Sequence, residues 1–205
     1  MYSILEKELI NIQNFDTISL ERKTILQHLI DFIQEKIDHE NIINLNFICT
    51  HNSRRSHLAQ IWAQFSSFYY KIPNVFCYSG GTEETAVYPK IIETLVLQGF
   101  QIVKISEGKN PIYTIKYGIN HPPIIAFSKK FDDNFNPSSH FAAVMTCSDA
   151  DYGCPNVNDA EIRIPITYED PKTSDNKPNQ NEVYIQKSNE IATEMMYVFS
   201  QIKRK

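Results

Sequence analysis

Apolar residues recur at two periods along the chain, and these periods predict alternating helices and strands. In the stretch ISLERKTILQHLIDFIQEKID they return at steps of three and four, the period of one helix face, and Ser19 is placed to cap that helix. From Ile43 to Phe47 they alternate with asparagines, which is the period of a strand. We therefore expect residues 1–40 to be mainly helical and a strand to follow them.

The same alternation continues to the end of the chain. The elements that period and turn residues predict are a helix with its apolar face at Leu58, Ile61, Trp62, Phe65 and Tyr69; a strand at 74–79 that Gly80 and Gly81 stop; a helix at 88–98 capped by Gly99; short strands within 101–128; strands at 140–147 and 161–167; and a helix at 182–203. The polar stretches 131–140 and 170–180 are predicted to be loops.

Strands that alternate with helices favour a parallel sheet covered by helices on both faces. Active sites of such sheets lie beyond the carboxyl ends of the strands. Cys49 and Cys147 each stand at such an end. The sequence therefore predicts one α/β domain over residues 1–205, with its chemistry near these two thiols.

Composition and charge narrow the class of protein. The chain has 205 residues, of which 42% are hydrophobic and 21% charged, as is typical of a globular domain with one core. A formal net charge of −4 argues against a nucleic-acid-binding protein. No apolar run approaches the roughly 18 residues of a membrane span, and the first residues do not resemble a secretory signal. We therefore expect a cytoplasmic protein whose four cysteines stay reduced and serve chemistry, metal binding or packing.

The segment CTHNSRRS, which begins at Cys49, joins a predicted strand to a predicted helix. Backbone N–H groups of such a loop can surround an oxyanion, and the same field favours the thiolate form of Cys49. The fork of Arg55 can bind two oxygens of a tetrahedral anion, Ser56 can donate to the sulfur, and Asn52 suits the tight turn. The residues expected to form the oxyanion-binding loop are Thr50, His51, Asn52, Ser53, Arg54, Arg55 and Ser56.

The spacing C-x5-R-S resembles the signature loop of the low-molecular-weight protein tyrosine phosphatases. The positions that match are Cys49, Asn52, Ser53, Arg55 and Ser56. His51 and Arg54 depart from the family, in which a glycine and a small or thiol residue are common. The resemblance implies a three-layer α/β sandwich with a mainly parallel, about four-stranded sheet. It leaves residues 1–40 as a helical extension and residues 101–140 as an insertion, whose aromatic side chains could line the substrate entrance or a dimer contact.

The segment MTCSDADYGCPN, which holds Cys147 and Cys154, resembles part of the thioredoxin-coupled arsenate reductases, which share the phosphatase fold. The resemblance implies a relay: Cys49 attacks arsenic, Cys147 resolves the adduct, and Cys154 passes the disulfide to a thioredoxin-like reductant. Two other interpretations stay open. The pair could bind zinc, although the usual spacing is missing, or the thiols could be idle in an enzyme that is only a phosphatase. Cys77 is expected in the core.

The leaving oxygen of such a reaction needs a proton donor. The stretch TYEDPKT offers Glu169 and Asp170, and the Asp-Pro pair resembles the one that carries the general acid in this family. Taken alone, the pair would be a solvated acidic turn. Ser79 resembles a serine of the family that supports the loop from behind, and His57 is expected to be structural or on the surface.

The leading hypothesis is therefore an arsenate reductase. Its expected catalytic residues are Cys49, Arg55, Asp170, Cys147 and Cys154. The alternative enzyme is a low-molecular-weight protein tyrosine phosphatase, and a third hypothesis is an oxyanion or thiol sensor without turnover. We expect an arsenate- or phosphate-type oxyanion and a thioredoxin-like reductant as partners, and no cofactor, metal, nucleic acid or membrane.

Overall fold

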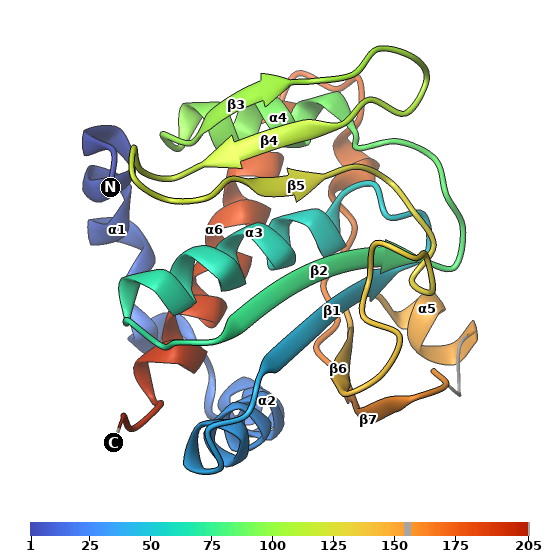
Figure 1. The fold of residues 1–205 in the computed structure, drawn as a ribbon. Coiled ribbons are helices and arrows are strands. Elements are labelled where there is room, and N and C mark those ends of the chain that lie inside the picture. Colours follow the sequence, from blue (N-terminus) through green and yellow to red (C-terminus); the bar gives the residue numbers. More distant parts are fainter. Residues whose placement is uncertain (154–156, 205) are drawn as a thin grey trace.

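A sheet of four parallel strands forms the centre of the protein (Figure 1). The computed structural model describes residues 1–153 and 157–204. The strands of the central sheet, in their order across it, are β2 (Val75–Gly81), β1 (Ile43–Cys49), β6 (Phe141–Met145) and β7 (Ala160–Pro165). All of them end at the same edge, because they are parallel, so the residues after β1 and β6 are brought together there.

Helices cover one face of this sheet over the larger of two cores. They are α3 (Arg55–Tyr69), α4 (Pro89–Leu97) and α6 (Gln180–Ser200), with α3 against β1 and β2 and α6 behind α3. Trp62 on α3 is completely buried, and its indole N–H donates to the Ser188 hydroxyl at 2.9 Å. The α/β fold predicted from the sequence is thereby confirmed.

The other face carries a smaller core that includes Ile48, Cys49, Met145 and Cys147. It is covered in part by α5 (Ser148–Gly153), a short helix that the apolar pattern did not predict, because its sequence SDADYG is mostly polar. The two thiols expected at strand ends therefore share one apolar cluster.

The insertion forms a second sheet of its own. Its strands are β3 (Gln101–Lys104), β4 (Tyr113–Lys116) and β5 (Ile124–Ala126), and they are antiparallel. The sheet lies on the outer side of α3 and α4 (Figure 1). Gln60 on α3 joins it to the central sheet, because its amide donates to the carbonyls of both Cys77 and Ile125, at 3.0 and 3.3 Å.

The N-terminal extension packs against α6. Its elements are α1 (Ser3–Ile12), the 3-10 turn η1 (Phe15–Thr17) and α2 (Leu20–Asp38), and α2 also reaches β1 and β7. Ser19 caps α2 as predicted, by accepting from the backbone N–H of Arg22. Gly99, with a φ of 97°, follows α4 and lies against the backbone of Leu5, where a Cβ atom would collide.

Gly80 and Gly81 do not stop β2, which runs through both of them. A Cβ atom on Gly80 would collide with the backbone of Phe131. One on Gly81 would collide with the Glu83 carbonyl oxygen and would stand 2.7 Å from both the Asn52 nitrogen and the Thr50 oxygen. These glycines serve close approach rather than chain termination, because the insertion and the loop after β1 both press on this end of the strand.

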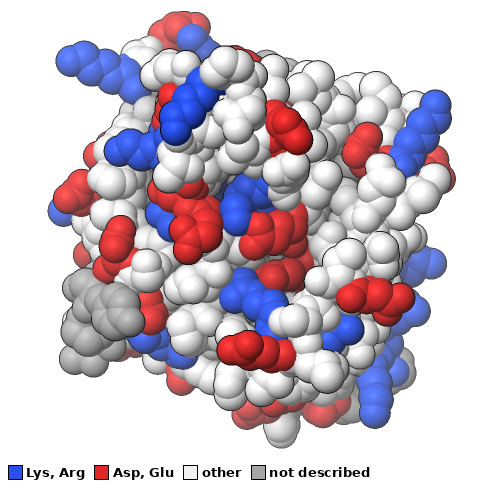
Figure 2. Space-filling view, turned by 180° about the vertical axis from the view of Figure 1, so that it is seen from behind, with Lys and Arg blue, Asp and Glu red and all other residues white. Residues whose placement is uncertain are grey.

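The stretch 170–180, predicted to be a surface loop, contains the 3-10 turn η2 (Pro171–Ser174). Both ends of this turn, Pro171 and Ser174, are buried, so the segment is anchored rather than free in solvent. On the face drawn in Figure 2, acidic and basic side chains of the described residues are interspersed rather than gathered into a basic stripe. Among the described residues, no helix has the length and apolar character of a membrane span.

Candidate active site

The segment from Thr50 to Arg54 connects β1 to α3, and Asn52 fixes its shape. Asn52 has a φ of 44°, a left-handed conformation that asparagine tolerates. Its side chain bonds in two directions: Nδ2 donates to Ser56 Oγ at 2.9 Å, and Oδ1 accepts from the Lys129 backbone N–H at 2.9 Å. This one side chain therefore ties the turn to the start of α3 and to the insertion.

Cys49 lies at the floor of the loop, with 4% of its surface exposed. Its sulfur is 3.1 Å from Ser56 Oγ. Because that oxygen already accepts from Asn52, the Ser56 hydroxyl proton is free to point at the sulfur. The arrangement provides a hydrogen bond that a thiolate accepts better than a thiol does.

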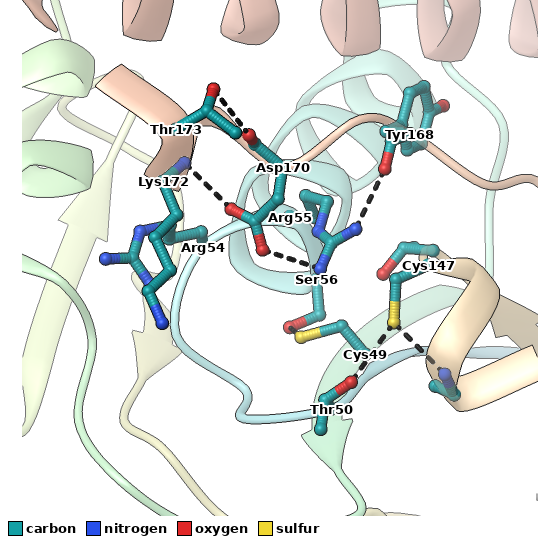
Figure 3. Close-up of polar contacts among 12 residues, drawn as sticks. Cys49, Thr50, Arg54, Arg55, Ser56, Cys147, Tyr168, Asp170, Lys172 and Thr173 are labelled. Atoms are coloured by element: carbon teal, nitrogen blue, oxygen red, sulfur yellow. Dashed lines mark hydrogen bonds and ion pairs between the residues drawn. The ribbon is translucent and has the colours of Figure 1, made fainter. Parts of the chain in front are cut away.

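Arg55 begins α3 and reaches across to the segment after β7 (Figure 3). Its Nη1 donates to the Tyr168 carbonyl at 2.9 Å, and its Nη2 pairs with Asp170 Oδ2 at 2.7 Å. The guanidinium is largely buried, and its Nε has no hydrogen-bond partner among the described residues. One N–H of the fork is thus not committed to the protein.

Asp170 is the N-cap of η2 as well as the partner of Arg55. Its Oδ1 accepts from the Lys172 backbone N–H at 3.0 Å, and its side chain is 31% exposed. It is therefore held in direction while keeping access to solvent, which is needed to exchange a proton. Glu169, its acidic neighbour, is exposed.

His57 and Ser79 support the loop from below. His57 Nε2 is 2.9 Å from the Asn52 carbonyl, and its Nδ1 is 3.2 Å from Ser79 Oγ. Burial and the nearby charge of Lys129 lower the pKa of His57 to about 3, so the ring is neutral. A neutral ring fits both contacts when Nε2 donates to the carbonyl and Nδ1 accepts from the serine hydroxyl. Ser79 thus acts on the loop through His57.

Cys147 follows β6 and is completely buried. Its sulfur is 3.5 Å from the hydroxyl oxygen of Thr50 and accepts from the Ala150 backbone N–H at 3.3 Å. The second thiol is thus beside the residue that follows Cys49 in the chain. Cys154 lies outside the described residues. Cys77 is buried in the larger core, as expected, and burial raises the pKa of its thiol.

The other loop residues differ in direction. His51 is exposed, with its ring 3.5 Å from Glu83. The Ser53 carbonyl accepts from the Tyr88 backbone N–H at 3.0 Å. The side chain of Arg54 donates to the Tyr184 hydroxyl and the Asp175 carboxylate, both outside the loop. Only its backbone N–H could therefore face a bound anion.

Sequence reasoning missed the contribution of the insertion. Ser128 Oγ donates to the His51 carbonyl at 3.0 Å, and the Lys129 backbone N–H bonds Asn52. The Lys129 side chain is itself completely buried, and burial lowers its pKa to about 8. The stretch AFSKKF gave no signal for this role, because these bonds are mostly made by backbone groups or by a common serine.

Comparison with known proteins identifies the fold. No protein-family model matches the sequence, and no curated protein matches it. A YwlE mutant from Bacillus subtilis has a TM-score of 0.50 over 78% of this chain and 97% of its own, at 14% identity. A low molecular weight phosphotyrosine phosphatase from Vibrio cholerae O395 has a TM-score of 0.49 over 77% of this chain and 94% of its own, at 15% identity.

A thioredoxin-dependent arsenate reductase from Corynebacterium glutamicum has a TM-score of 0.39 at 19% identity, over 81% of this chain and 66% of its own. The chain has the α/β fold of the low-molecular-weight phosphatases, with helices added at its N-terminal end. The resemblance seen in the sequence is confirmed at the level of the fold.

Proposed function

We propose that the protein is an arsenate reductase in which Cys49 attacks an arsenate ion held by the loop 50–56. The position of Cys147 carries the proposal. Its thiol is completely buried in the same cluster as Cys49, with its sulfur 3.5 Å from the hydroxyl oxygen of Thr50. Arsenate reduction needs a second reducing thiol beside the first, whereas hydrolysis of a phosphate ester does not.

The proposed anion site consists of loop N–H groups, the start of α3 and the fork of Arg55. The uncommitted Nε of Arg55 and the small exposure of Cys49 suit a compact tetrahedral oxyanion. The proposed reaction uses no cofactor or metal ion, because its two electrons come from the thiols themselves.

In the first step the thiolate of Cys49 attacks arsenic. An S–As bond forms, an As–O bond breaks, and protonated Asp170 gives its proton to the leaving oxygen, which departs as water. The contact of Asp170 with Arg55 at 2.7 Å places the acid beside the anion site.

In the second step the thiolate of Cys147 attacks the sulfur of Cys49. An S–S bond forms and the S–As bond breaks with both electrons left on arsenic, which is released as arsenite. Cys154 then attacks the sulfur of Cys147, which frees Cys49 and leaves a 147–154 disulfide. A thioredoxin-like dithiol reduces that disulfide and completes the cycle.

An assay of arsenite release with thioredoxin, its reductase and NADPH tests the proposal. We expect sustained turnover by the wild type, none by Cys49→Ser, and no more than one arsenite per protein from Cys154→Ser. Cys77→Ser, which alters a thiol of the other core, is the matched control. Full multiple turnover by Cys154→Ser would contradict the relay.

A tyrosine phosphatase is the second candidate, and the contact between Asp170 and Arg55 supports it too, because a proton donor at that place would serve ester hydrolysis as well as arsenate reduction. An arylphosphate assay separates the two functions. Rapid hydrolysis that is unaffected by Cys147→Ser and Cys154→Ser, together with no reduction of arsenate, would establish the phosphatase.

A further inference from the structure

Arg54 and Arg55, neighbours in the loop, each pair with an aspartate of the segment 170–175. Arg55 Nη2 is 2.7 Å from Asp170 Oδ2, and Arg54 Nη2 is 2.6 Å from Asp175 Oδ2. Two adjacent residues of the anion loop are therefore tied to two ends of the turn that carries the proposed acid.

The two pairs differ in burial. The side chain of Asp170 is 31% exposed, whereas that of Asp175 is 15% exposed and that of Arg54 13%. Asp175 Oδ1 also accepts from the Tyr184 hydroxyl at 2.6 Å and from Gln180 Nε2 at 3.1 Å. The pair of Arg54 with Asp175 is therefore the harder one to break, because it has more partners and less water around it.

The guanidinium of Arg54 is held on all sides. Its Nε donates to the Tyr184 hydroxyl at 2.8 Å, and its centre lies 4.0 Å from the middle of the Tyr88 ring. Burial opposes its charge, but the Tyr184 contact and the carboxylates of Asp175 and Asp170 raise its pKa overall. Arg54 therefore remains a cation wherever the protein is folded.

The turn between the two aspartates is stiff. The Asp170 carboxylate accepts from the Lys172 N–H at 3.0 Å, and the Asp175 N–H donates to the Lys172 carbonyl at 3.0 Å. Ser174 Oγ also donates to the Pro171 carbonyl at 2.8 Å, and both of these residues are buried. Because the turn is stiff, any contact that holds Asp175 in place also holds Asp170 in place.

Binding of an oxyanion would weaken the ion pair between Arg55 and Asp170. The anion competes for the fork of Arg55, and Asp170, which must carry a proton to act as the acid, then loses the cation that holds it. Without a second anchor the acid segment would drift away when its proton is needed, and a misplacement of about 1 Å can cost roughly 100-fold in rate.

We propose that Arg54 is a positioning residue, which holds the acid segment through Asp175 while Arg55 transfers from Asp170 to the bound oxyanion. The inference rests on the proposed oxyanion site. It gives a role to one of the two residues at which this loop departs from the phosphatase pattern.

Hydrogen exchange with inorganic phosphate as the probe tests the inference without requiring turnover. In the wild type, amides 172–175 should stay protected at saturating phosphate. In Arg54→Met the same amides should exchange at least tenfold faster when phosphate is bound, with phosphate affinity changed by less than about threefold, since the anion loop keeps its N–H groups.

Asp175→Asn should reproduce this effect from the other side of the pair, and it also serves if Arg54→Met does not fold. Arg54→Lys should restore part of the protection, because an ammonium can pair with Asp175 but cannot also bond Tyr184 in the same geometry. Lys36→Met, which removes an ion pair with Glu161, is the control for general destabilisation. With arsenate, Arg54→Met should lower kcat about tenfold or more and change KM little.

Equal protection of amides 172–175 in phosphate-bound wild type and Arg54→Met would overturn the inference while leaving the proposed function intact. Failure of the wild type to bind either phosphate or arsenate would overturn both. Loss of kcat in Arg54→Met with unchanged protection would also count against the positioning role.

Discussion

Ser56 is placed to donate a hydrogen bond to a neighbouring sulfur. Its oxygen accepts from Asn52 and lies 3.1 Å from the sulfur of Cys49. The fork of Arg55 stands on the other side of the proposed anion site, with bonds to Tyr168 and Asp170. At the scale of single residues, the site is a set of donors that are fixed before any anion arrives, which is the arrangement that lowers reorganisation during reaction.

Arg55→Lys should lower kcat/KM for arsenate roughly 100-fold, because an ammonium has no planar fork for two anion oxygens. The measurement is steady-state kinetics on protein whose fold is verified by circular dichroism. Arg204→Lys, at an exposed residue near the C-terminal end, is the matched control. Wild-type kinetics in Arg55→Lys would show that the fork does not bind the anion.

His57 should make stability depend on acid pH. Its folded pKa of about 3 lies below the ordinary value of 6.5, so below pH 6.5 the unfolded chain binds a proton that the native protein does not. The free energy of unfolding should therefore fall as the pH drops from 6.5 towards 3, with this residue contributing up to about 1.4 kcal/mol per pH unit.

Urea unfolding of the wild type and His57→Gln between pH 4 and 6 measures this contribution as a difference in slope. His39→Gln, at an exposed histidine, is the control substitution. The same slope in all three proteins would mean that His57 titrates normally in the native state.

At the scale of elements, the end of β2 carries the loop on its backbone. Gly81 allows the chain at Asn52 and Thr50 to lie directly on the strand, and Gly80 does the same for the insertion at Phe131. Two glycines after a strand pattern predict that the strand stops, because glycine usually breaks strands. The packing of two other segments on this strand end is what requires it.

Gly81→Ala should therefore distort the anion loop. The added Cβ would collide with the Glu83 carbonyl oxygen and would lie 2.7 Å from backbone atoms of Asn52 and Thr50, so we expect a loss of about 1–3 kcal/mol in stability and at least tenfold in activity. Gly108→Ala is the control, because a Cβ there meets nothing within 4 Å although its φ of 113° makes alanine strained. It should lose stability without losing activity. Unchanged activity in Gly81→Ala would refute the close-approach argument.

At the scale of the whole molecule, the N-terminal extension is joined to the site by a buried charge. Arg22 on α2 pairs with Glu194 on α6 through Nε at 2.7 Å and Nη2 at 2.9 Å. Glu194 also accepts from the Tyr168 hydroxyl at 2.7 Å, and the Tyr168 carbonyl holds Arg55. The extension thus neutralises a carboxylate that would otherwise be buried beside the residue that orients the catalytic arginine of the proposed mechanism.

A double-mutant cycle measures this link. Arg22→Met leaves Glu194 buried without its cation and should cost about 3–5 kcal/mol of unfolding free energy, measured in urea. The double variant Arg22→Met with Glu194→Gln should lose less than the sum of the two single losses, because the uncompensated charge is gone. Strict additivity would show that the two side chains do not act as a pair.

Much of the fold follows from local pattern. The periods of apolar residues placed most helices and strands correctly, and the alternation indicated the parallel sheet. The pattern did not predict the helix α5, because six mostly polar residues have no apolar face to detect. It did not predict the antiparallel pairing of β3, β4 and β5 either, because short strands give no local signal of their partner or direction.

The amino-acid sequence by itself determined most of the order of the elements and the side chains that the loop from Cys49 to Ser56 carries, because period and spacing act over a few residues. Only the tertiary structure decided which groups meet. Three contacts show this. Arg55 donates to the Tyr168 carbonyl, 113 residues away in the sequence, and Arg54 pairs with Asp175, 121 residues away. Thr50 contacts Cys147, 97 residues away. Such contacts depend on how whole helices and strands pack, and no local period encodes that.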